Sequence, residues 1–219
     1  MSAHAVSLSG YLVLSDLGRS TRSRTCEVRE KPHRDVPPYF DDLEPSFALK
    51  CIDLDDAMPV DSKQRAVQEM QELLNLQHPN IVRYHRAFIY EGRFSYMTEF
   101  AECGTLHHLV YTVKERQHRL PEPLLWHLFT QICHGLKSVH DLGLVHRSLK
   151  TRNLLLFPER LYAHPYAKYR CKLTDLAIPE LQRQQRLNEL DGSRLRYLAP
   201  EVRILRGSTH TTCPPVALD

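Results

Sequence analysis

The stretch His146-Arg-Ser-Leu-Lys-Thr-Arg-Asn153 carries most of the information about the fold. Apolar residues flank it, with Leu144-Val145 before it and Leu154-Leu-Leu-Phe157 after it. Functional side chains are commonly held on a loop of this kind, between rigid elements. A short strand candidate, Cys171–Thr174, follows, and directly after it stands Asp175-Leu-Ala177.

The two halves of the chain differ in their predicted secondary structure. The first half alternates short strand candidates with polar loops, and its clearest strand is Phe47–Ile52. One helix interrupts it, with Asp61-Ser62 as candidate N-cap and His78-Pro79-Asn80 as its end. After Gly104 the pattern becomes helical, and Pro121-Glu122-Pro123 opens a long amphipathic segment. The pattern indicates an α+β fold with two lobes. Further strands are expected at Tyr11–Leu14, Cys26–Val28, Ile81–Tyr84 and Phe94–Phe100.

Composition excludes several classes of protein. Of 219 residues, 42% are apolar and 25% charged, which argues against wholesale disorder. The formal net charge of +3 is too small to indicate a nucleic acid or a membrane as partner. No apolar run approaches the ~18 residues of a membrane span, and the start lacks the basic segment of a signal peptide. Six scattered cysteines without a C-x-x-C pair predict neither a disulfide framework nor a zinc site.

Motifs in a fixed order resemble those of the eukaryotic protein kinases. His146–Asn153 resembles the catalytic loop H-R-D-L-x-x-x-N, with Ser148 at the position of the Asp. Asp175-Leu-Ala177 resembles D-F-G, and Ala199-Pro-Glu201 matches A-P-E. Upstream, Phe47-Ala-Leu-Lys50 resembles V-A-I-K. The set covers essentially the whole chain, which is identified as a member of this superfamily, of the Ser/Thr type.

The resemblance implies a kinase-like, two-lobed α+β fold with definite boundaries. Residues 1–100 are the expected N-lobe, a β-sheet with one helix and a Pro-rich loop insertion at 30–46. Residues 101–219 are the expected C-lobe, with the catalytic loop at 146–153 and an activation segment at 175–201. The chain stops near the start of a further helix of the family. We therefore expect a C-lobe truncated before its end, with apolar surface of the helix at 123–140 exposed.

The resemblance also implies a site for ATP and Mg²⁺. Phosphoryl transfer depends on positioning and on neutralising the phosphate charge. Lys50 is expected to bind the α- and β-phosphates and to be held by Glu69, with Glu72 as the alternative. Asn153 and Asp175 are expected to bind Mg²⁺. The other expected contacts are Lys150 near the γ-phosphate, Gly18 in the Gly-rich loop, Ala48 and Leu155 around adenine, Thr98 as gatekeeper, and the hinge residues Glu99 and Ala101.

Three departures from the family pattern bear on activity. Ser148 replaces the Asp that accepts the proton of the substrate hydroxyl, and a Ser hydroxyl is a poor base at neutral pH. Loss of a positioned general base typically costs ~10²–10⁴-fold in rate. In the Gly-rich loop only Gly18 is kept, while Ser20 and Ser23 stand at the other two glycine positions. Ala177 replaces the glycine of D-F-G.

Three functional hypotheses follow. In the first, which these departures favour, the chain is a pseudokinase that binds ATP and Mg²⁺ and acts through protein partners. In the second, it is a weakly active Ser/Thr kinase that transfers the γ-phosphate of ATP to protein hydroxyls. In the third, it is a fragment of a longer kinase without a function of its own. The absence of targeting signals predicts a cytoplasmic location, with entry into the nucleus also open.

Overall fold

The computed structural model describes residues 10–20, 23–31, 45–54, 59–146, 148–159 and 168–176. The side chains of residues 62, 65, 69 and 72 lie outside this description. So does everything from Ala177 onward, which includes most of the predicted activation segment.

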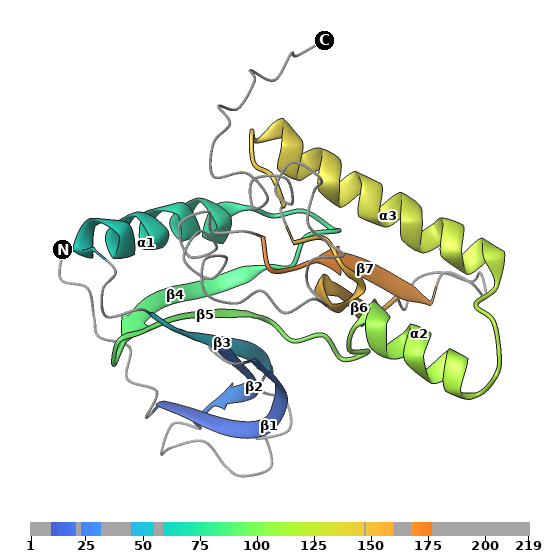
Figure 1. Cartoon of the computed structure of the whole chain (residues 1–219), viewed down its shortest axis with the longest axis horizontal. Coiled ribbons are helices and arrows are strands. Elements are labelled where there is room, and N and C mark those ends of the chain that lie inside the picture. Colours follow the sequence, from blue (N-terminus) through green and yellow to red (C-terminus); the bar gives the residue numbers. More distant parts are fainter. Residues whose placement is uncertain are drawn as a thin grey trace, which may run out of the picture.

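A five-stranded antiparallel sheet forms the first part of the fold, with strand order β1-β2-β3-β5-β4 (Figure 1). The strands are β1 (Tyr11–Arg19), β2 (Ser23–Glu30), β3 (Phe47–Asp53), β4 (Tyr84–Tyr90) and β5 (Arg93–Glu99). Because side chains alternate across a strand, the sheet buries residues on both faces. One face carries the cluster of Val28, Leu49 and Met97, and the other carries Ile52 and Phe94. The predicted strand at Phe47–Ile52 is confirmed.

Helix α1 (Val60–Asn75) packs along β4, on one side of the sheet (Figure 1). Its buried residues Ala66, Met70 and Leu73 follow the predicted helical period. The predicted N-cap at Asp61-Ser62 is wrong, because the cap residue is Pro59 and makes no side-chain hydrogen bond. Asp61 instead lies in the first turn, where its charge is favourable to the helix dipole.

The predicted strand at Ile81–Tyr84 is also wrong. The segment from Ile81 to Arg83 connects α1 to β4, which begins at Tyr84. Ile81 makes a single isolated bridge to Leu173, and the Val82 N–H donates to the Leu173 carbonyl at 2.8 Å. Ile81 and Val82 are both fully buried, so their apolar character reflects burial of a connecting segment.

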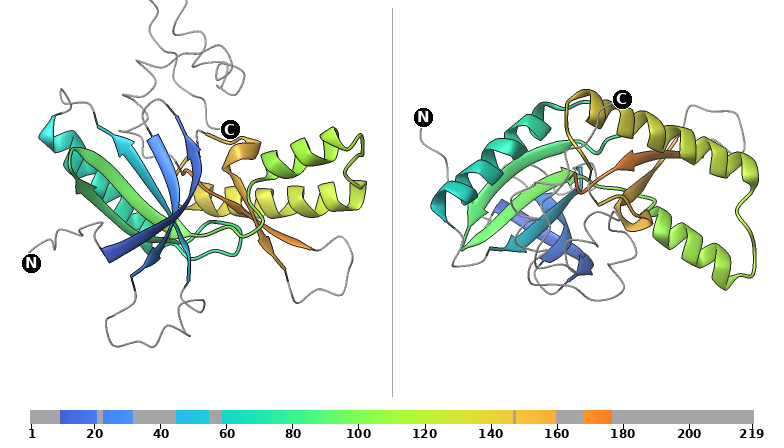
Figure 2. Two further views of the ribbon diagram at one scale, coloured as in Figure 1. Left: turned by 90° about the horizontal axis from the view of Figure 1, so that it is seen from below. Right: turned by 45° about the horizontal axis from the view of Figure 1, so that its top comes forward.

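The second part is mostly helical, and together the two parts confirm the predicted α+β class. It contains α2 (Leu106–Glu115), α3 (Glu122–Asp141), the 3-10 turn η3 (Thr151–Asn153) and a hairpin of β6 (Leu154–Pro158) and β7 (Tyr169–Leu173). Helix α3 lies over β7, and α2 lies beside η3 and β6 (Figure 2). Leu156, Cys171 and Leu173 of the hairpin are fully buried. The lobe boundary at residue 100 stays a prediction.

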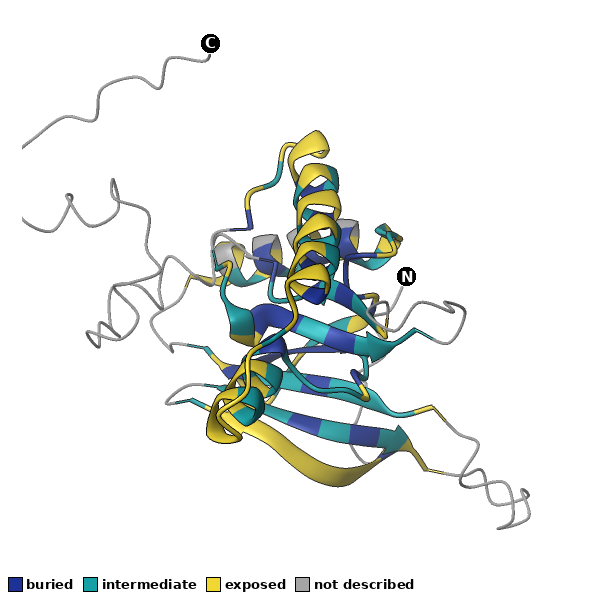
Figure 3. Ribbon diagram, turned by 90° about the vertical axis from the view of Figure 1, so that its right-hand side faces the viewer, coloured by how far each residue is buried: buried dark blue, intermediate teal, exposed yellow. Residues whose placement is uncertain are grey.

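One hydrophobic cluster joins the two parts, running from Met70 and Phe94 to Leu128 and Leu156. Some apolar side chains of α3 remain outside it, and the outer surface of that helix is largely exposed (Figure 3). The most exposed are Leu125, Trp126 and Phe129, as expected for the helix at 123–140. None of the described helices is both long and apolar enough to cross a membrane.

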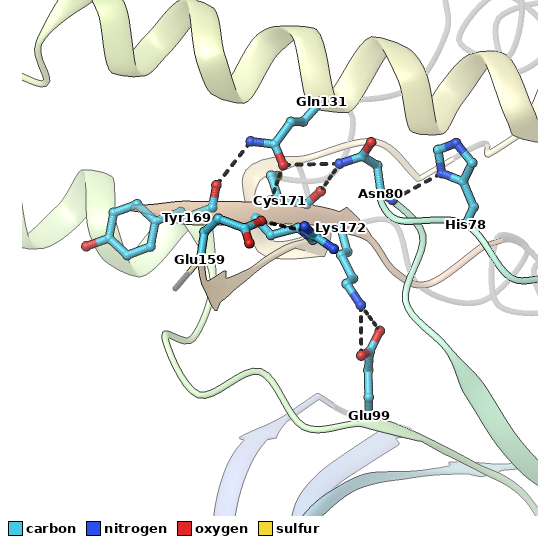
Figure 4. Close-up of polar contacts among 9 residues, drawn as sticks. His78, Asn80, Glu99, Gln131, Glu159, Tyr169, Cys171 and Lys172 are labelled. Atoms are coloured by element: carbon cyan, nitrogen blue, oxygen red, sulfur yellow. Dashed lines mark hydrogen bonds and ion pairs between the residues drawn. The ribbon is translucent and has the colours of Figure 1, made fainter. Parts of the chain in front are cut away.

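A polar network ties the segment after α1 to the hairpin (Figure 4). The Asn80 amide nitrogen donates to the Gln131 side-chain oxygen at 3.1 Å and to the Cys171 carbonyl at 3.0 Å. The same Gln131 oxygen accepts the Cys171 N–H at 2.8 Å, and its amide nitrogen donates to the Tyr169 carbonyl at 3.0 Å. These polar groups satisfy one another's hydrogen-bonding capacity, and the bonds fix the position of β7 along α3. Asp175 follows β7, so the network also positions that residue.

Candidate functional site

The centre of the site is an ion pair between β3 and the end of β7. The Lys50 ammonium group donates to Oδ1 of Asp175, and the two residues are 125 positions apart in the sequence. The Tyr96 hydroxyl, from β5, donates to the same oxygen at 2.6 Å. Asp175 has a backbone φ of 61°, in the left-handed region that few non-glycine residues occupy. Such conformations persist only where surrounding contacts determine them, and here both donors do so.

The electrostatics keep the Asp175 carboxylate charged. Burial by itself favours the neutral acid and raises the pKa. The charge of Lys50 and the hydrogen bonds from Lys50 and Tyr96 outweigh burial, and the charge of Lys150 acts in the same direction. Together they lower the pKa of Asp175 to about 2. The site therefore presents an anionic carboxylate at every physiological pH.

This shift predicts a component of acid denaturation that belongs to Asp175. Its pKa is about 2 in the folded chain against 3.8 in the unfolded one, so the stabilisation is complete above pH 4 and is lost as pH falls through 2. The difference in unfolding free energy between wild type and Asp175→Asn should shrink by about 2 kcal/mol between pH 5 and pH 2. Urea unfolding at each pH measures it. A difference that stays constant over this range contradicts the pairing, since the other carboxylates cancel between the two proteins.

The predicted catalytic loop is tied to the same centre through Asn153. This buried side chain donates from its amide nitrogen to the Ser148 carbonyl at 2.8 Å and to the Ser148 hydroxyl oxygen at 3.0 Å. The Asn153 carbonyl accepts the Thr174 N–H at 3.0 Å, which links the loop to the residue before Asp175. Within the described residues the Ser148 hydroxyl meets an amide donor and no carboxylate or imidazole. Among the residues that the structure describes, no base therefore activates the group at the position of the catalytic Asp.

The oxygens of Asn153 and Asp175 fit a magnesium ion. In the described part of the chain, the Asn153 side-chain oxygen and Oδ2 of Asp175 accept no hydrogen bond. Both are hard oxygen ligands, and Mg²⁺ is usually held by one or two carboxylates together with substrate phosphates. No cluster of three or more His, Cys, Asp or Glu side chains suited to a metal occurs among the described residues. The donor set is thus one that suits a metal bound together with a nucleotide.

The turn between β1 and β2 differs from a phosphate-binding loop in its hydrogen bonds. The Ser20 N–H donates to the Ser23 carbonyl at 2.7 Å, and the Ser23 N–H donates to the Ser20 hydroxyl at 3.1 Å. A Gly-rich loop binds phosphate with such backbone N–H groups, and here both are used within the turn. Arg19 and Arg24 each form an ion pair with Asp16, at 3.8 and 3.0 Å. The N–H groups of Ser20 and Ser23, the described residues of the turn, are therefore already bonded and are not offered to a phosphate.

The predicted adenine contacts lie around β5 and the segment after it. Thr98, the predicted gatekeeper, is buried and pairs with Ala48 across β3 and β5. The Glu99 carboxylate accepts hydrogen bonds from the Lys172 ammonium group at 2.6 and 2.8 Å (Figure 4), and the Glu99 N–H donates to the Arg83 carbonyl at 3.0 Å, so neither group is left for a ligand. Ala101 is buried, and its N–H has no hydrogen-bond partner in the described part of the chain. Its role as a backbone donor to adenine stays a prediction.

The remaining predicted residues make no contact with Lys50 or Asp175 that the structure describes. Gly18 pairs with Thr25 in β2, and its N–H donates to the Asp16 carboxylate at 3.2 Å. Leu155 pairs with Lys172 in the β6–β7 hairpin and is partly buried. Glu69 lies on α1, but its side chain is outside the described residues, so its pairing with Lys50 stays a prediction. The nucleotide-binding roles of all these residues likewise stay predictions.

Sequence reasoning missed Tyr96. The available signal was strand register, because Tyr96 stands directly opposite Lys50 when β3 and β5 pair. Tyr84 lies in the main hydrophobic cluster together with Leu73 and Leu176. Its hydroxyl also accepts the Leu176 N–H at 3.3 Å. Two tyrosines therefore hold the segment Asp175-Leu176.

His146, the first residue of the predicted catalytic loop, is buried and has no partner on either ring nitrogen among the described residues. Burial lowers its pKa, so the ring is neutral. Its carbonyl accepts the Ser148 N–H at 2.7 Å, which shapes the start of the loop. His146 thus behaves as a core residue.

Comparison with known proteins agrees with this geometry. The family model described as "Protein kinase domain" matches residues 41–214, which is well over half of the chain. The chain belongs to the protein kinase family. Human serine/threonine-protein kinase Nek10 is 32% identical over 205 residues, which cover 89% of this chain and 16% of that protein. The kinase domain is also similar to two further relatives. The cytokinesis protein sepH of Emericella nidulans is 32% identical over a region that covers 75% of this chain and 11% of that protein. The ribosomal protein S6 kinase 2 alpha of Xenopus laevis is 27% identical over a region that covers 93% of this chain and 25% of that protein.

This kinase-family chain therefore spans a quarter or less of the length of these relatives. Protein kinases as a family bind ATP and Mg²⁺. The resemblance to the Ser/Thr kinases that the motifs indicated is confirmed.

Proposed function

We propose that this chain is a pseudokinase that binds ATP with Mg²⁺ and acts by contacting protein partners. The observation that carries the proposal is the contrast between two parts of one site. Lys50 and Asp175 form the ion pair that we expect of a site for phosphate and a metal ion. Ser148, in contrast, offers a hydroxyl that is hydrogen-bonded by the Asn153 amide and has no neighbouring base among the described residues.

Each retained residue has a binding role that its environment supports. Lys50 supplies the positive charge for the α- and β-phosphates, and Ala101 supplies a free N–H for adenine. Asp175 and Asn153 supply hard oxygens for the metal, which neutralises phosphate charge when bound. The internally bonded turn at Ser20 and Ser23 removes phosphate donors, so we expect weaker binding than in a kinase with an intact Gly-rich loop.

A second candidate is a weakly active Ser/Thr kinase. One observation favours it: Lys150, whose charge already acts on Asp175, follows Ser148 by two positions and would lie near a transferred phosphoryl group. Electrostatic stabilisation of the transferred group persists without a general base, so slow transfer is compatible with this site. The third hypothesis, a fragment without independent function, predicts the absence of a cooperative melt. A cytoplasmic location stays a prediction from the sequence.

Thermal unfolding with ATP tests nucleotide binding. A ligand that binds only the folded chain stabilises it by RT ln(1 + [L]/Kd), about 2.7 kcal/mol at a hundredfold excess over Kd. For a domain of this size that corresponds to a rise in Tm of roughly 5–10 °C. We expect a Mg²⁺-dependent rise in the wild type and none in Lys50→Ala. Lys137→Ala is the control, since Lys137 is exposed on α3 and, within the described residues, forms an ion pair with Asp141 alone.

A cooperative melt that ATP does not move contradicts nucleotide binding and leaves a scaffold without ligand. Transfer of phosphate by the wild type that disappears in Asp175→Ala favours the weakly active kinase over the pseudokinase. Each variant is compared by the change in Tm that ATP causes, because loss of the Lys50 charge also lowers the starting stability.

A further inference from the structure

We propose that Tyr96 is a positioning residue for the metal ligand Asp175. By donating its hydroxyl to Oδ1, it holds the carboxylate so that Oδ2 is left for Mg²⁺. The inference rests on the proposed function, because it concerns the metal-dependent part of nucleotide binding.

The Tyr96 ring is fixed by its neighbours. Only 5% of the residue is exposed. The ring packs against Tyr84 at 5.7 Å and Phe94 at 6.2 Å between centroids, and the backbone is paired opposite Lys50 in the centre of the sheet. A hydroxyl on so constrained a ring has little freedom to turn away from the Asp175 carboxylate. The 2.6 Å contact is therefore a directed, charge-assisted hydrogen bond.

The need for such a bond follows from what Lys50 does when nucleotide binds. In the structure both Lys50 and Tyr96 donate to Oδ1 of Asp175. A Lys50 ammonium group that binds the phosphates has part of its hydrogen-bonding capacity directed to them. Tyr96 then remains as the neutral donor that keeps Oδ1 occupied. Hydrogen-bond partners of metal-ligating carboxylates commonly change metal affinity by about 10–100-fold when they are removed.

Tyr84, the neighbouring tyrosine, makes a different contact from Tyr96. Its hydroxyl accepts the backbone N–H of Leu176 and does not reach the Asp175 carboxylate in the described contacts. Tyr96 is thus the one described tyrosine whose hydroxyl bonds the carboxylate directly. A Tyr96→Phe substitution keeps the packed ring and removes only this bond.

The test measures the affinity for a fluorescent ATP analogue with Mg²⁺ and with EDTA, in wild type and Tyr96→Phe. We expect the variant to lose about tenfold in affinity with Mg²⁺ and to keep its affinity in EDTA. A purely structural role moves both affinities together, so an equal loss in both arms overturns the inference. Tyr111→Phe is the matched control, because Tyr111 is exposed on α2 and its hydroxyl makes no described hydrogen bond.

A double-mutant cycle with Asp175→Asn tests whether Tyr96 acts through Asp175. If Tyr96 acts through Asp175, the Tyr96→Phe effect disappears in the Asp175→Asn background. An effect that persists there assigns Tyr96 to another role and overturns the inference. If wild type and Tyr96→Phe bind the nucleotide equally well with Mg²⁺, the inference about Tyr96 is overturned but the proposed function is not. A wild type that binds no nucleotide in either arm overturns the proposed function as well. All variants are compared at a temperature at which their far-ultraviolet circular dichroism equals that of the wild type.

Discussion

Replacing Ser148 with Asp should raise phosphoryl transfer from ATP to a protein substrate by about 10²–10⁴-fold. The expectation follows from the surroundings of Ser148. Its hydroxyl oxygen already accepts a hydrogen bond from the Asn153 amide at 3.0 Å, and the same amide holds its carbonyl. A carboxylate at this position would accept that bond and gain an orientation from it. It would also supply the base that a hydroxyl at neutral pH does not.

Ser148→Asn and Ser148→Ala are the controls for this substitution. Ser148→Asn has nearly the same size and shape as the Asp variant but no basic oxygen, so we expect no gain. The measurement is incorporation of labelled γ-phosphate into a generic Ser/Thr substrate. The double variant Ser148→Asp/Lys50→Ala gives the background incorporation that is subtracted. An Asp variant that is no faster than the Asn variant shows that more than the base is missing. The internally bonded turn at Ser20 and Ser23 is then the first place to look.

Substitutions at Gly135 should destabilise the fold in proportion to the size of the new side chain. Gly135 lies in α3, where a Cβ atom would stand 2.6 Å from the Asn80 carbonyl oxygen and 2.9 Å from Cδ1 of Leu173. That carbonyl accepts the Leu173 N–H at 2.9 Å, so it cannot move without breaking a hydrogen bond. Helix propensity favours Ala over Gly by about 1 kcal/mol, and overpacking costs about 1–3 kcal/mol. We expect Gly135→Ala to lower the free energy of unfolding by about 1 kcal/mol and Gly135→Val by about 3 kcal/mol or more.

Urea unfolding followed by circular dichroism measures these losses. Cys133→Ala is the control, because Cys133 is an exposed residue of the same helix and should change stability by less than about 0.5 kcal/mol. A Gly135→Ala protein as stable as the wild type would show that α3 lies farther from Asn80 than the structure places it. The test is independent of nucleotide binding, so it checks the scaffold separately from the site.

The α+β class, the order of the motifs and much of the secondary structure were predictable from local pattern. Phe47–Ile52 forms a strand because a short apolar run, interrupted only by Lys50, matches a strand with buried residues on both faces of the sheet. The helix over Val60–Asn75 follows from the spacing of Ala66, Met70 and Leu73. Burial also produced the error at Ile81–Tyr84, because a buried connection and a short strand have the same apolar composition.

The sequence by itself determined which residue types are present at the site: Lys50, Asn153 and Asp175 are there, and Ser148 stands where a carboxylate is expected. Only the tertiary structure decided how they are used. Asp175 and Tyr96 are 79 positions apart, and their hydrogen bond depends on strand pairing and packing that no local pattern encodes. The same holds for the contact of Gly135 with Asn80. Local preference acts through near neighbours in the chain, whereas a side chain's partner is set by the elements that pack around it.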